Sequence, residues 1–320
     1  MAMEIVNCNL CGSNSHRLVY TIPDTRYFGD EWFNVVECME CGLGFVNPRP
    51  SFSEMPRYYP ATYYDYFEEE RHDHPRRYAA ESKFIESVAS PEHRSLLDIG
   101  CANGGFPRTM QRLGWKVEGV EVSSNAKPIS DFKVYRQEFK DIPISKPHYD
   151  VVTAWAVLEH VHDPMAYFKK ASVLLKSGGI FVFLVTNFES ISSRYLFLED
   201  VPRHLYFFTE KIVKKYLEVS GFDLIKKDYS DKVFSMRPVN WLRHYLYRYG
   251  KKQMLQWKDV RFTRGNIIGG VEVQQPLRER LKFLALNPLF IMDRMLLPIY
   301  EKYQMISKKY GIVTYVGKKR

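Results

Sequence analysis

A strand that runs into a turn of small residues at positions 95–106 constrains the fold of this chain more than any other feature. The sequence there reads SLLDIGCANGGF, in which an apolar run reaches Asp98 and then breaks into small residues, among them Gly100, Ala102 and Gly104. Small residues let the backbone turn sharply and let a ligand approach its N–H groups. The stretch therefore predicts a buried strand that leads into a cofactor-binding turn.

Alternating strands and helices surround this turn. Buried strands are expected at residues 95–100, 116–123, 132–139, 149–155 and 179–187, with helical stretches such as 164–179 between most of them. This repetition predicts an α/β fold with a doubly wound, mostly parallel sheet, whose ligands bind beyond the carboxyl ends of the strands. The chain of 320 residues is long enough for one such domain and smaller attachments.

The charge beside the turn discriminates between two cofactors. A dinucleotide would place its pyrophosphate on the turn, and the carboxylate of Asp98 would repel it. S-adenosylmethionine carries a sulfonium and an ammonium group and no phosphate, so Asp98 suits it. Glu121 ends the second strand and can accept hydrogen bonds from both ribose hydroxyls. Both cofactors contain such a ribose, so Glu121 does not discriminate between them. We therefore expect S-adenosylmethionine.

Two matched cysteine pairs precede this region. Cys8 and Cys11 lie in CNLCG, and Cys38 and Cys41 lie in CMECG. Two such knuckles complete the tetrahedral set of four thiolates that structural zinc prefers, which leaves no open position for catalysis. We expect Zn²⁺ to stabilise a zinc-ribbon-like module over residues 1–50, which is too short to build a core alone. Residues 51–75 then form a linker whose tyrosines either pack under the module or line the substrate pocket.

Four motifs occur in the order typical of one enzyme family. LLDIGCANGGF, GVEVS, the pair Glu138 and Phe139, and YDVVTAWAVLEHVHDP resemble the successive motifs of class I S-adenosylmethionine-dependent methyltransferases over residues 75–230. The CxxCG units and GFVNPRP resemble a bacterial subgroup of that family that is often associated with glycan, cell-envelope and secondary-metabolite pathways. The resemblance implies a Rossmann-like sheet of seven strands with the last one antiparallel. Ala102 replaces the usual middle glycine of the loop, and its methyl group is tolerable there if φ is negative.

The resemblance also implies roles for individual residues. Asp98 would help to hold the methionine part, Glu121 would bind the ribose, and Glu138 would bond the adenine amino group. The other cofactor contacts that it implies are backbone approach at Gly100, Cys101 and Gly104, packing of Val122 on the adenine, a backbone N–H from Phe139, and a lining of the methionine end by Ala154 and Trp155. We interpret the side chain of Cys101 as a small buried hydrophobe without reactivity.

Two histidines near strand ends are candidates for the base that removes a proton from an acceptor hydroxyl. His204 follows the fifth strand, where this family often places acceptor-side residues, and His160 follows the fourth strand. We rank His204 first and His160 second. Each could instead only order its own segment by hydrogen bonds.

The last third of the chain is strongly basic. Residues 231–320 contain 19 Lys and Arg against 6 Asp and Glu, whereas the whole chain has a net charge of +9. Strands at 222–229 and 311–320 would close the sheet as a hairpin, so residues 76–230 and 311–320 form the methyltransferase domain and 231–310 form an insertion. The insertion is partly amphipathic, with prolines and charges that exclude a clean membrane span. We expect a helical cap over the pocket, a membrane-surface segment or a homodimer interface.

Together these features predict a methyltransferase for a small-molecule acceptor, such as a sugar, a glycan, or a cell-envelope or secondary-metabolite intermediate. An RNA methyltransferase is the alternative, but the cysteine module is acidic overall and AWAVLE stands where a base-flipping motif of the Asn-Pro-Pro-Tyr type would lie. We therefore do not expect nucleic acid as a partner. A non-catalytic scaffold that binds S-adenosylmethionine is a third possibility. The first ten residues show no export signal, so we expect a cytoplasmic location, peripheral at the inner membrane face if the insertion binds lipid.

Overall fold

The fold is taken from a computed structural model of the chain. It describes residues 2–24, 31–60, 74–123, 126, 129–230, 232–253, 267–268, 271–272 and 288–320. Residues 61–73, which include most of the tyrosine-rich linker, lie outside the described residues, as does most of the span 254–287 of the expected insertion.

A seven-stranded mixed sheet forms the centre of the methyltransferase part. The strands lie in the order β12-β15-β10-β9-β6-β7-β8, and β15 is antiparallel to both of its neighbours. This arrangement confirms the fold class expected from the sequence, including the antiparallel last strand. The bounds are β6 Ser95–Ile99, β7 Lys116–Val120, β8 Lys133–Tyr135, β9 Tyr149–Trp155, β10 Leu175–Thr186, β12 Phe222–Asp228 and β15 Ile312–Lys319.

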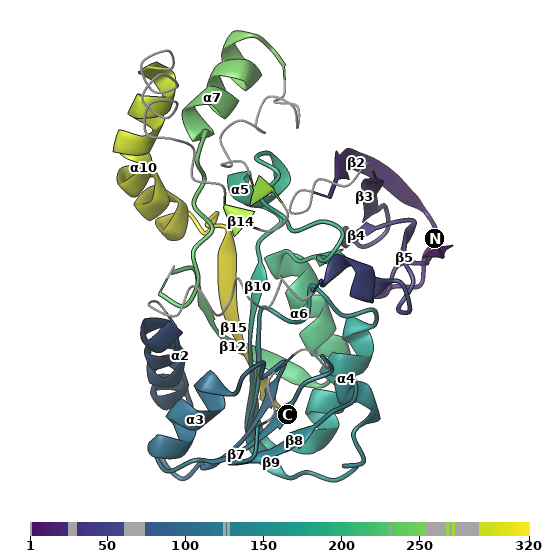
Figure 1. Ribbon diagram of the computed structural model, residues 1–320, viewed down its shortest axis with the longest axis vertical. Coiled ribbons are helices and arrows are strands. Elements are labelled where there is room, and N and C mark those ends of the chain that lie inside the picture. Colours follow the sequence, from purple (N-terminus) through teal and green to yellow (C-terminus); the bar gives the residue numbers. More distant parts are fainter. Residues whose placement is uncertain are drawn as a thin grey trace.

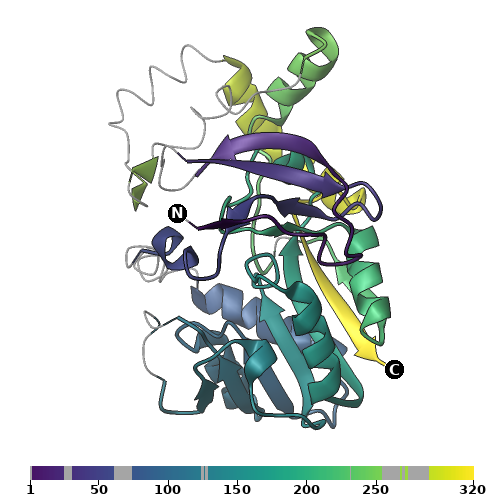
Figure 2. The same ribbon diagram turned by 90° about the vertical axis from the view of Figure 1, so that its right-hand side faces the viewer.

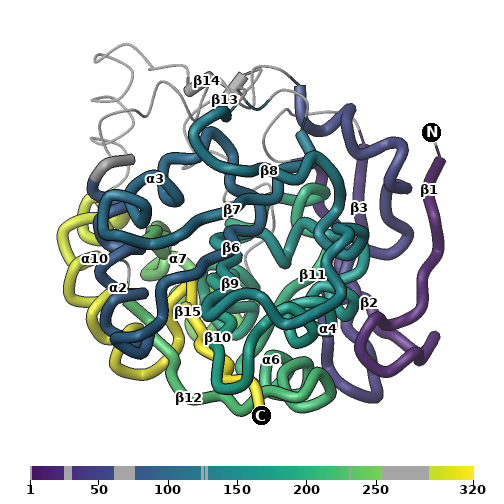
Figure 3. Tube along the Cα trace, turned by 90° about the horizontal axis from the view of Figure 1, so that it is seen from below, coloured from purple at the N-terminus to yellow at the C-terminus, as the bar shows by residue number. Residues whose placement is uncertain are grey.

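Helices cover both faces of this sheet (Figures 1 and 3). The helices α2 (His74–Val88) and α3 (Gly105–Arg112) lie on one face, and α4 (Pro164–Leu174) and α6 (Glu210–Val219) lie on the other. The strands β9 and β10 are buried along most of their length because they lie between two layers of helices. Phe168 of α4 stacks on Tyr216 of α6 with ring centroids 5.0 Å apart. This core fixes the carboxyl ends of β6, β7 and β9 side by side.

The N-terminal module is a small antiparallel sheet in the order β11-β4-β3-β2 (Figure 2). Its strands are β2 His16–Pro23, β3 Trp32–Cys38, β4 Gly44–Val46 and β11 Tyr206–Phe207, and a separate ladder pairs β1 Met3–Glu4 with β5 Arg49–Pro50. The strand β11 comes from the segment after β10. Gly44 allows this close pairing, since a Cβ at that position would lie 3.0 Å from Phe188 and Phe207. The module is therefore joined to the methyltransferase part by a shared sheet.

The described part of the insertion is helical. It contains α7 (Trp241–Tyr245), the π-helical turn η3 (Leu246–Gly250), the short hairpin β13 (Ile267–Ile268) and β14 (Val271–Glu272), and α10 (Pro288–Ile306). Trp241 stacks on Tyr300 at 4.1 Å, and the Asp293 carboxylate accepts the backbone N–H groups of Asn240 and Leu242. The helices α7 and α10 thus pack as a pair, above the carboxyl ends of the parallel strands in Figure 1.

Candidate active site

The cofactor loop lies between β6 and α3, as the sequence predicted. Gly100 and Gly104 have φ values of +71° and +76°, which glycine adopts without strain. A Cβ at Gly100 would lie 2.7 Å from Val157, and one at Gly105 would lie 2.2 Å from the ring of Tyr78. The glycines therefore let Val157 and Tyr78 pack directly against the backbone of the loop.

The φ of Ala102 is +46°, so its methyl group lies on a left-handed backbone and the negative φ that would tolerate it easily is not present. The conformation is held from outside the loop, since the Ala102 N–H donates to Glu121 Oε2 at 2.9 Å. The other oxygen of Glu121 accepts the Ser123 N–H at 2.8 Å. Glu121 thus fixes both the loop and the end of β7. Its expected bond to a ribose stays a prediction.

Asp98 is buried at the end of β6, where the Thr153 hydroxyl donates to its Oδ1 at 2.6 Å. Burial raises the pKa of Asp98 well above its usual range, and the hydrogen bond from Thr153 opposes that shift. A cation placed beside this carboxylate would favour its ionised form. The expected role of Asp98 in holding the methionine part of S-adenosylmethionine stays a prediction.

The remaining predicted cofactor residues lie along the same edge of the sheet. In the β6–β9 ladder Ile99 pairs with Ala154, so Ala154 and Trp155 end beside Gly100. Trp155 is buried, and its Nε1 has no hydrogen-bond partner among the described residues. Glu138 stands directly before the short helix η2 (Phe139–Asp141), and its carboxylate lies 2.6 Å from Lys140 Nζ. The side chain of Phe139 is buried, whereas that of Val122 is exposed. Their contacts with a cofactor stay predictions.

Cys101 packs as a small apolar side chain. A Cβ at Gly119 would lie 2.6 Å from its sulfur, so the thiol fills the space left by that glycine on β7. Burial raises the pKa of the Cys101 thiol, with further contributions from Asp98 and Glu121. The packing agrees with the interpretation of Cys101 as unreactive.

The helix α2 adds three polar side chains that the sequence reasoning missed. Arg77 Nε donates to Glu81 Oε1 at 2.8 Å. The charge of Glu81 raises the pKa of Asp98, and the charge of Arg77 lowers it. Glu81 is fully buried, and its second oxygen has no partner among the described residues. The ring of Tyr78 lies against Gly105 at the start of α3. The spacing of Arg77 and Glu81 by four residues, typical of a helical ion pair, was the available signal.

The two candidate bases, which are 44 positions apart in the sequence, lie together. The rings of His160 and His204 are 4.6 Å apart in an edge-to-face arrangement. The backbone oxygen of Glu159 accepts the Leu205 N–H at 2.7 Å, which joins the loop after β9 to the segment after β10. The structure thus brings His160 and His204 to one place.

His204 is held by a carboxylate that the sequence reasoning also missed. Its Nδ1 hydrogen-bonds to Glu199 Oε2, an oxygen that also accepts the Thr186 hydroxyl at 3.1 Å. The Ser193 hydroxyl donates to the other oxygen of Glu199. Because Glu199 can only accept when ionised, Nδ1 of His204 carries the proton and Nε2 offers a lone pair. Glu199 lies in an irregular segment, where no periodic pattern marked it.

The pKa values of the two histidines move in opposite directions. Burial lowers the pKa of His160 to about 3, so this ring is neutral at ordinary pH. Burial also acts to lower the pKa of His204, but the hydrogen bond and charge of Glu199 outweigh it and raise that pKa. Burial raises the pKa of the neighbouring Glu159 to about 7. His204 therefore has the stronger affinity for a proton.

Tyr59 and Tyr58 show both uses expected for the tyrosine-rich linker. The Tyr59 hydroxyl lies 3.0 Å from His160 Nδ1, which is also 3.1 Å from the backbone oxygen of Arg203. Tyr58 instead packs edge-to-face on Phe33 of the N-terminal module, with ring centroids 5.9 Å apart. One tyrosine lines the histidine site and the other packs under the module.

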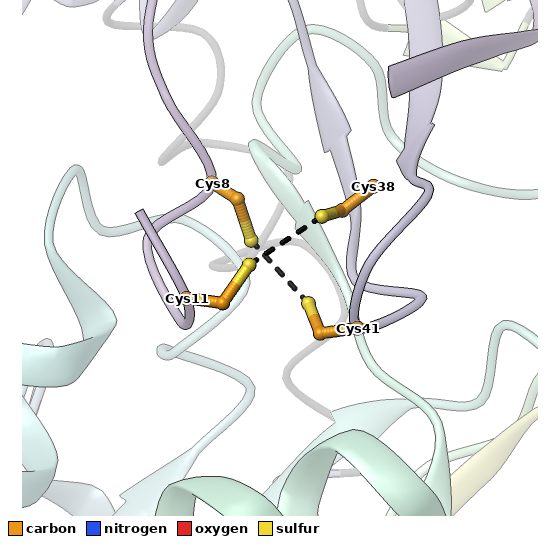
Figure 4. A group of neighbouring side chains, drawn as sticks. All are labelled: Cys8, Cys11, Cys38 and Cys41. Carbon is orange, nitrogen blue, oxygen red and sulfur yellow. Dashed lines mark hydrogen bonds between the residues drawn. The ribbon is translucent and has the colours of Figure 1, made fainter. Parts of the chain in front are cut away.

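The four predicted zinc ligands converge on one point (Figure 4). The sulfur of Cys8 lies 3.4 Å from that of Cys41, and the sulfur of Cys11 lies 3.5 Å from that of Cys38. Sulfur atoms bound tetrahedrally at about 2.3 Å from one zinc ion lie a little under 4 Å apart, so the four thiols fit such an ion. Glu159, His160 and His204 form a second group whose donor atoms lie within 4.8 Å of one another and could also hold a cation.

Comparison with known proteins agrees with this geometry. A family model described as a methyltransferase domain matches residues 69–227. A ubiquinone biosynthesis O-methyltransferase of Cereibacter sphaeroides strain ATCC 17029 is 30% identical over 178 residues, which cover 50% of this chain and 72% of that protein. The chain belongs to the family of S-adenosylmethionine-dependent methyltransferases. This confirms the family, and with it the cofactor of that family, predicted from the motifs.

Two further comparisons define how far this likeness extends. A ubiquinone biosynthesis O-methyltransferase of Paraburkholderia phytofirmans is 32% identical over 125 residues, which cover 36% of this chain. The chain spans 53% of the length of that relative. The solved structure of a SAM-dependent methyltransferase from Archaeoglobus fulgidus has 18% identity and a TM-score of 0.50, and the match covers 80% of this chain and 100% of that one. That likeness concerns the fold.

Proposed function

We propose that this chain transfers a methyl group from S-adenosylmethionine to a hydroxyl of a small-molecule acceptor. The observation that carries the proposal is the pairing of His204 with Glu199 beside His160, next to the loop that follows β9. A histidine whose Nδ1–H is held by a carboxylate presents Nε2 as a base. The relatives compared above are named O-methyltransferases, which supports an oxygen acceptor.

The residues of the cofactor side bind and orient. S-adenosylmethionine, when bound, supplies a methyl carbon that its sulfonium activates for displacement. Asp98 would face the cationic end, and Glu121 would bind the ribose while it holds Ala102 in place. Arg77 of α2 is the cation best placed for the carboxylate of the methionine part, since its charge already acts on Asp98. These contacts would align the methyl carbon with the acceptor, and alignment supplies much of the rate.

The residues of the acceptor side move one proton. Nε2 of His204 would take the proton of the acceptor hydroxyl as the oxygen bonds to the methyl carbon, and Glu199 would stabilise the resulting imidazolium. His160 remains neutral because burial lowers its pKa to about 3, so it would act as a hydrogen-bonding group and not as a competing charge. The proton then leaves to solvent when the methylated product departs.

The acceptor class is part of the proposal. We propose a hydroxylated precursor of a quinone, because the relatives are named for ubiquinone biosynthesis. The sugar or glycan acceptor expected from the sequence has no support from these relatives and ranks second. We also propose a cytoplasmic location, as the sequence suggested.

The test uses the full chain, methyl-labelled S-adenosylmethionine, and two acceptor panels: hydroxylated quinone precursors and nucleotide sugars. We expect label transfer to the first panel. His204→Ala should lower kcat by about 10²–10⁴-fold, the usual contribution of a general base, with unchanged affinity for S-adenosylmethionine. His148→Ala, which removes an exposed histidine elsewhere, is the matched control.

Three outcomes would contradict parts of this proposal. Unchanged kcat in His204→Ala would remove His204 from the mechanism. Transfer to nucleotide sugars alone would replace the acceptor class. Turnover that a chelator abolishes while the zinc of the four cysteines stays bound, and that a divalent cation restores, would make His204 a ligand of the Glu159, His160 and His204 group instead of a base.

We further propose that Cys8, Cys11, Cys38 and Cys41 hold a structural Zn²⁺. The convergence of four thiols from two turns supports it, and a fully thiolate-bound ion would leave no position for an acceptor.

A further inference from the structure

The helix α10 has the reverse of the usual pattern of a surface helix. Its buried side chains are mostly polar or aromatic: Asp293, Tyr300, Glu301 and Gln304, with Leu297. Large apolar side chains face outward instead. Seven of the twenty exposed large apolar side chains of the described residues lie on this one helix: Ile291, Met292, Met295, Leu296, Ile299, Tyr303 and Ile306. Exposed apolar clusters of this size mark an interaction surface.

The charges beside this face are of one sign. Residues 232–253 and 288–311 contain ten Lys and Arg and only two Asp and Glu. Both acids, Asp293 and Glu301, are buried, and Asp293 is bonded to backbone N–H groups at the start of α7. The cations Arg294 and Lys302 are exposed on α10 itself, and Arg248, Lys251 and Lys252 are exposed on and after η3. Within residues 232–253 and 288–311 the surface therefore combines apolar and basic groups, and the exposed acid beside it is Glu189, which pairs with Lys309 at 3.7 Å.

We propose that the exposed apolar face of α10 lies on the surface of an anionic membrane. Apolar side chains that enter the acyl boundary, with cations at the level of the headgroups, are the pattern of an interfacial helix. None of the helices in the described parts of the chain is long and apolar enough to cross a bilayer. Leu246 and Tyr249 of η3, the turn that continues α7, are exposed as well.

A second copy of the chain suits this surface less well. In a two-fold symmetric dimer the same patch meets itself, so the cations of one copy would face those of the other. In the described part of the insertion, the acids Asp293 and Glu301 are buried and do not reach such an interface. Anionic lipid headgroups would neutralise these cations, so vesicles without anionic lipid serve as the control.

The surface lies close to the acceptor side. The Ser192 hydroxyl of α5 (Ile191–Arg194) donates to the backbone oxygen of Met236 at 3.0 Å, and Tyr195 packs on His244 of α7 with ring centroids 5.1 Å apart. The segment between β10 and β11 that carries Glu199 and His204 is thus in contact with the root of the insertion. A membrane-bound helix pair would place this side of the protein toward lipid.

Flotation of the full chain with vesicles tests the proposal independently of methyl transfer. We expect co-flotation with phosphatidylcholine vesicles that contain phosphatidylglycerol, and weak flotation with phosphatidylcholine alone. Met295→Asp and Ile299→Asp together should lower partitioning by more than about tenfold, since each replaces an apolar side chain that would enter the acyl boundary with a charged one. Val219→Asp changes an equally exposed apolar residue on α6 and should leave flotation unchanged.

Two results would overturn the proposal. Equal flotation with neutral and anionic vesicles, or none with either, would exclude an anionic surface as the occupant. A dimer in light scattering that the Met295→Asp and Ile299→Asp pair dissociates, without flotation, would assign the face to a second copy. If the proposal is right, the tryptophan fluorescence of the Met295→Trp chain gains a blue-shifted component only when anionic vesicles are present.

Discussion

At the scale of single residues, the proposed site depends on the hydrogen-bond partners of a few buried polar groups. His204 and His160 were predicted separately, each from its place after a strand, and the fold brings their rings to 4.6 Å. Glu199, the residue that sets the tautomer of His204, could not be predicted, because it lies in an irregular loop without a spacing rule. The positive φ of Ala102 could not be predicted, because the bond from its N–H to Glu121 joins two separate turns.

The pair of Glu199 and His204 makes a prediction about pH. A base acts only when deprotonated, and Glu199 raises the pKa of His204 above its ordinary value of 6.5. The rate should therefore rise with pH through a midpoint above that value. Glu199→Gln removes the charge but can keep a hydrogen bond, so the midpoint should move to lower pH and kcat should fall. The pH profile of kcat for both proteins checks this, and an unmoved midpoint would contradict the assignment of His204.

At the scale of elements, the alternation of strands and helices along the chain, with the residues of the turns, made the main sheet predictable. Each expected strand from 95–100 to 311–320 is present, because buried parallel strands read as short apolar runs. The pairing of β11 with β4 was not predictable, because a two-residue strand leaves no pattern and its partner is 160 positions away in the sequence. The ion pair of Arg77 and Glu81 was missed because the sequence does not show that Glu81 is buried while Arg77 keeps a quarter of its side chain exposed.

The cysteine cluster makes a prediction at this scale. Cys11→Ser should lose stoichiometric zinc and lower the melting temperature, because zinc binding contributes to folding of the module that carries β2, β3 and β4. Elemental analysis and thermal melts of the full chain measure the two effects. Cys101→Ala, which removes the cysteine outside the cluster, should keep its zinc. Equal zinc content in Cys11→Ser and the unsubstituted chain would refute the site.

At the scale of the whole molecule, the module, the sheet and the insertion meet at one edge. The buried Arg203 bonds Asp24 of the module through Nη2 and Oδ1 at 2.6 Å and lies directly before His204 in the sequence. The insertion contacts the same segment from the other side through Met236 and His244. The sequence predicted the three parts but not their meeting point, because contacts between distant segments leave no local pattern. Both attachments therefore border the acceptor side.

The central claim is that the turn after β6 holds S-adenosylmethionine, and calorimetric titration of the full chain tests it most directly. We predict that S-adenosylmethionine binds with one molecule per chain and that NADH does not bind. Asp98→Asn should weaken binding by about tenfold to a hundredfold, since a hydrogen bond to a charged group contributes about 1.5–3 kcal/mol. Binding of NADH, or of neither compound, would contradict the claim and with it the proposed methyl transfer.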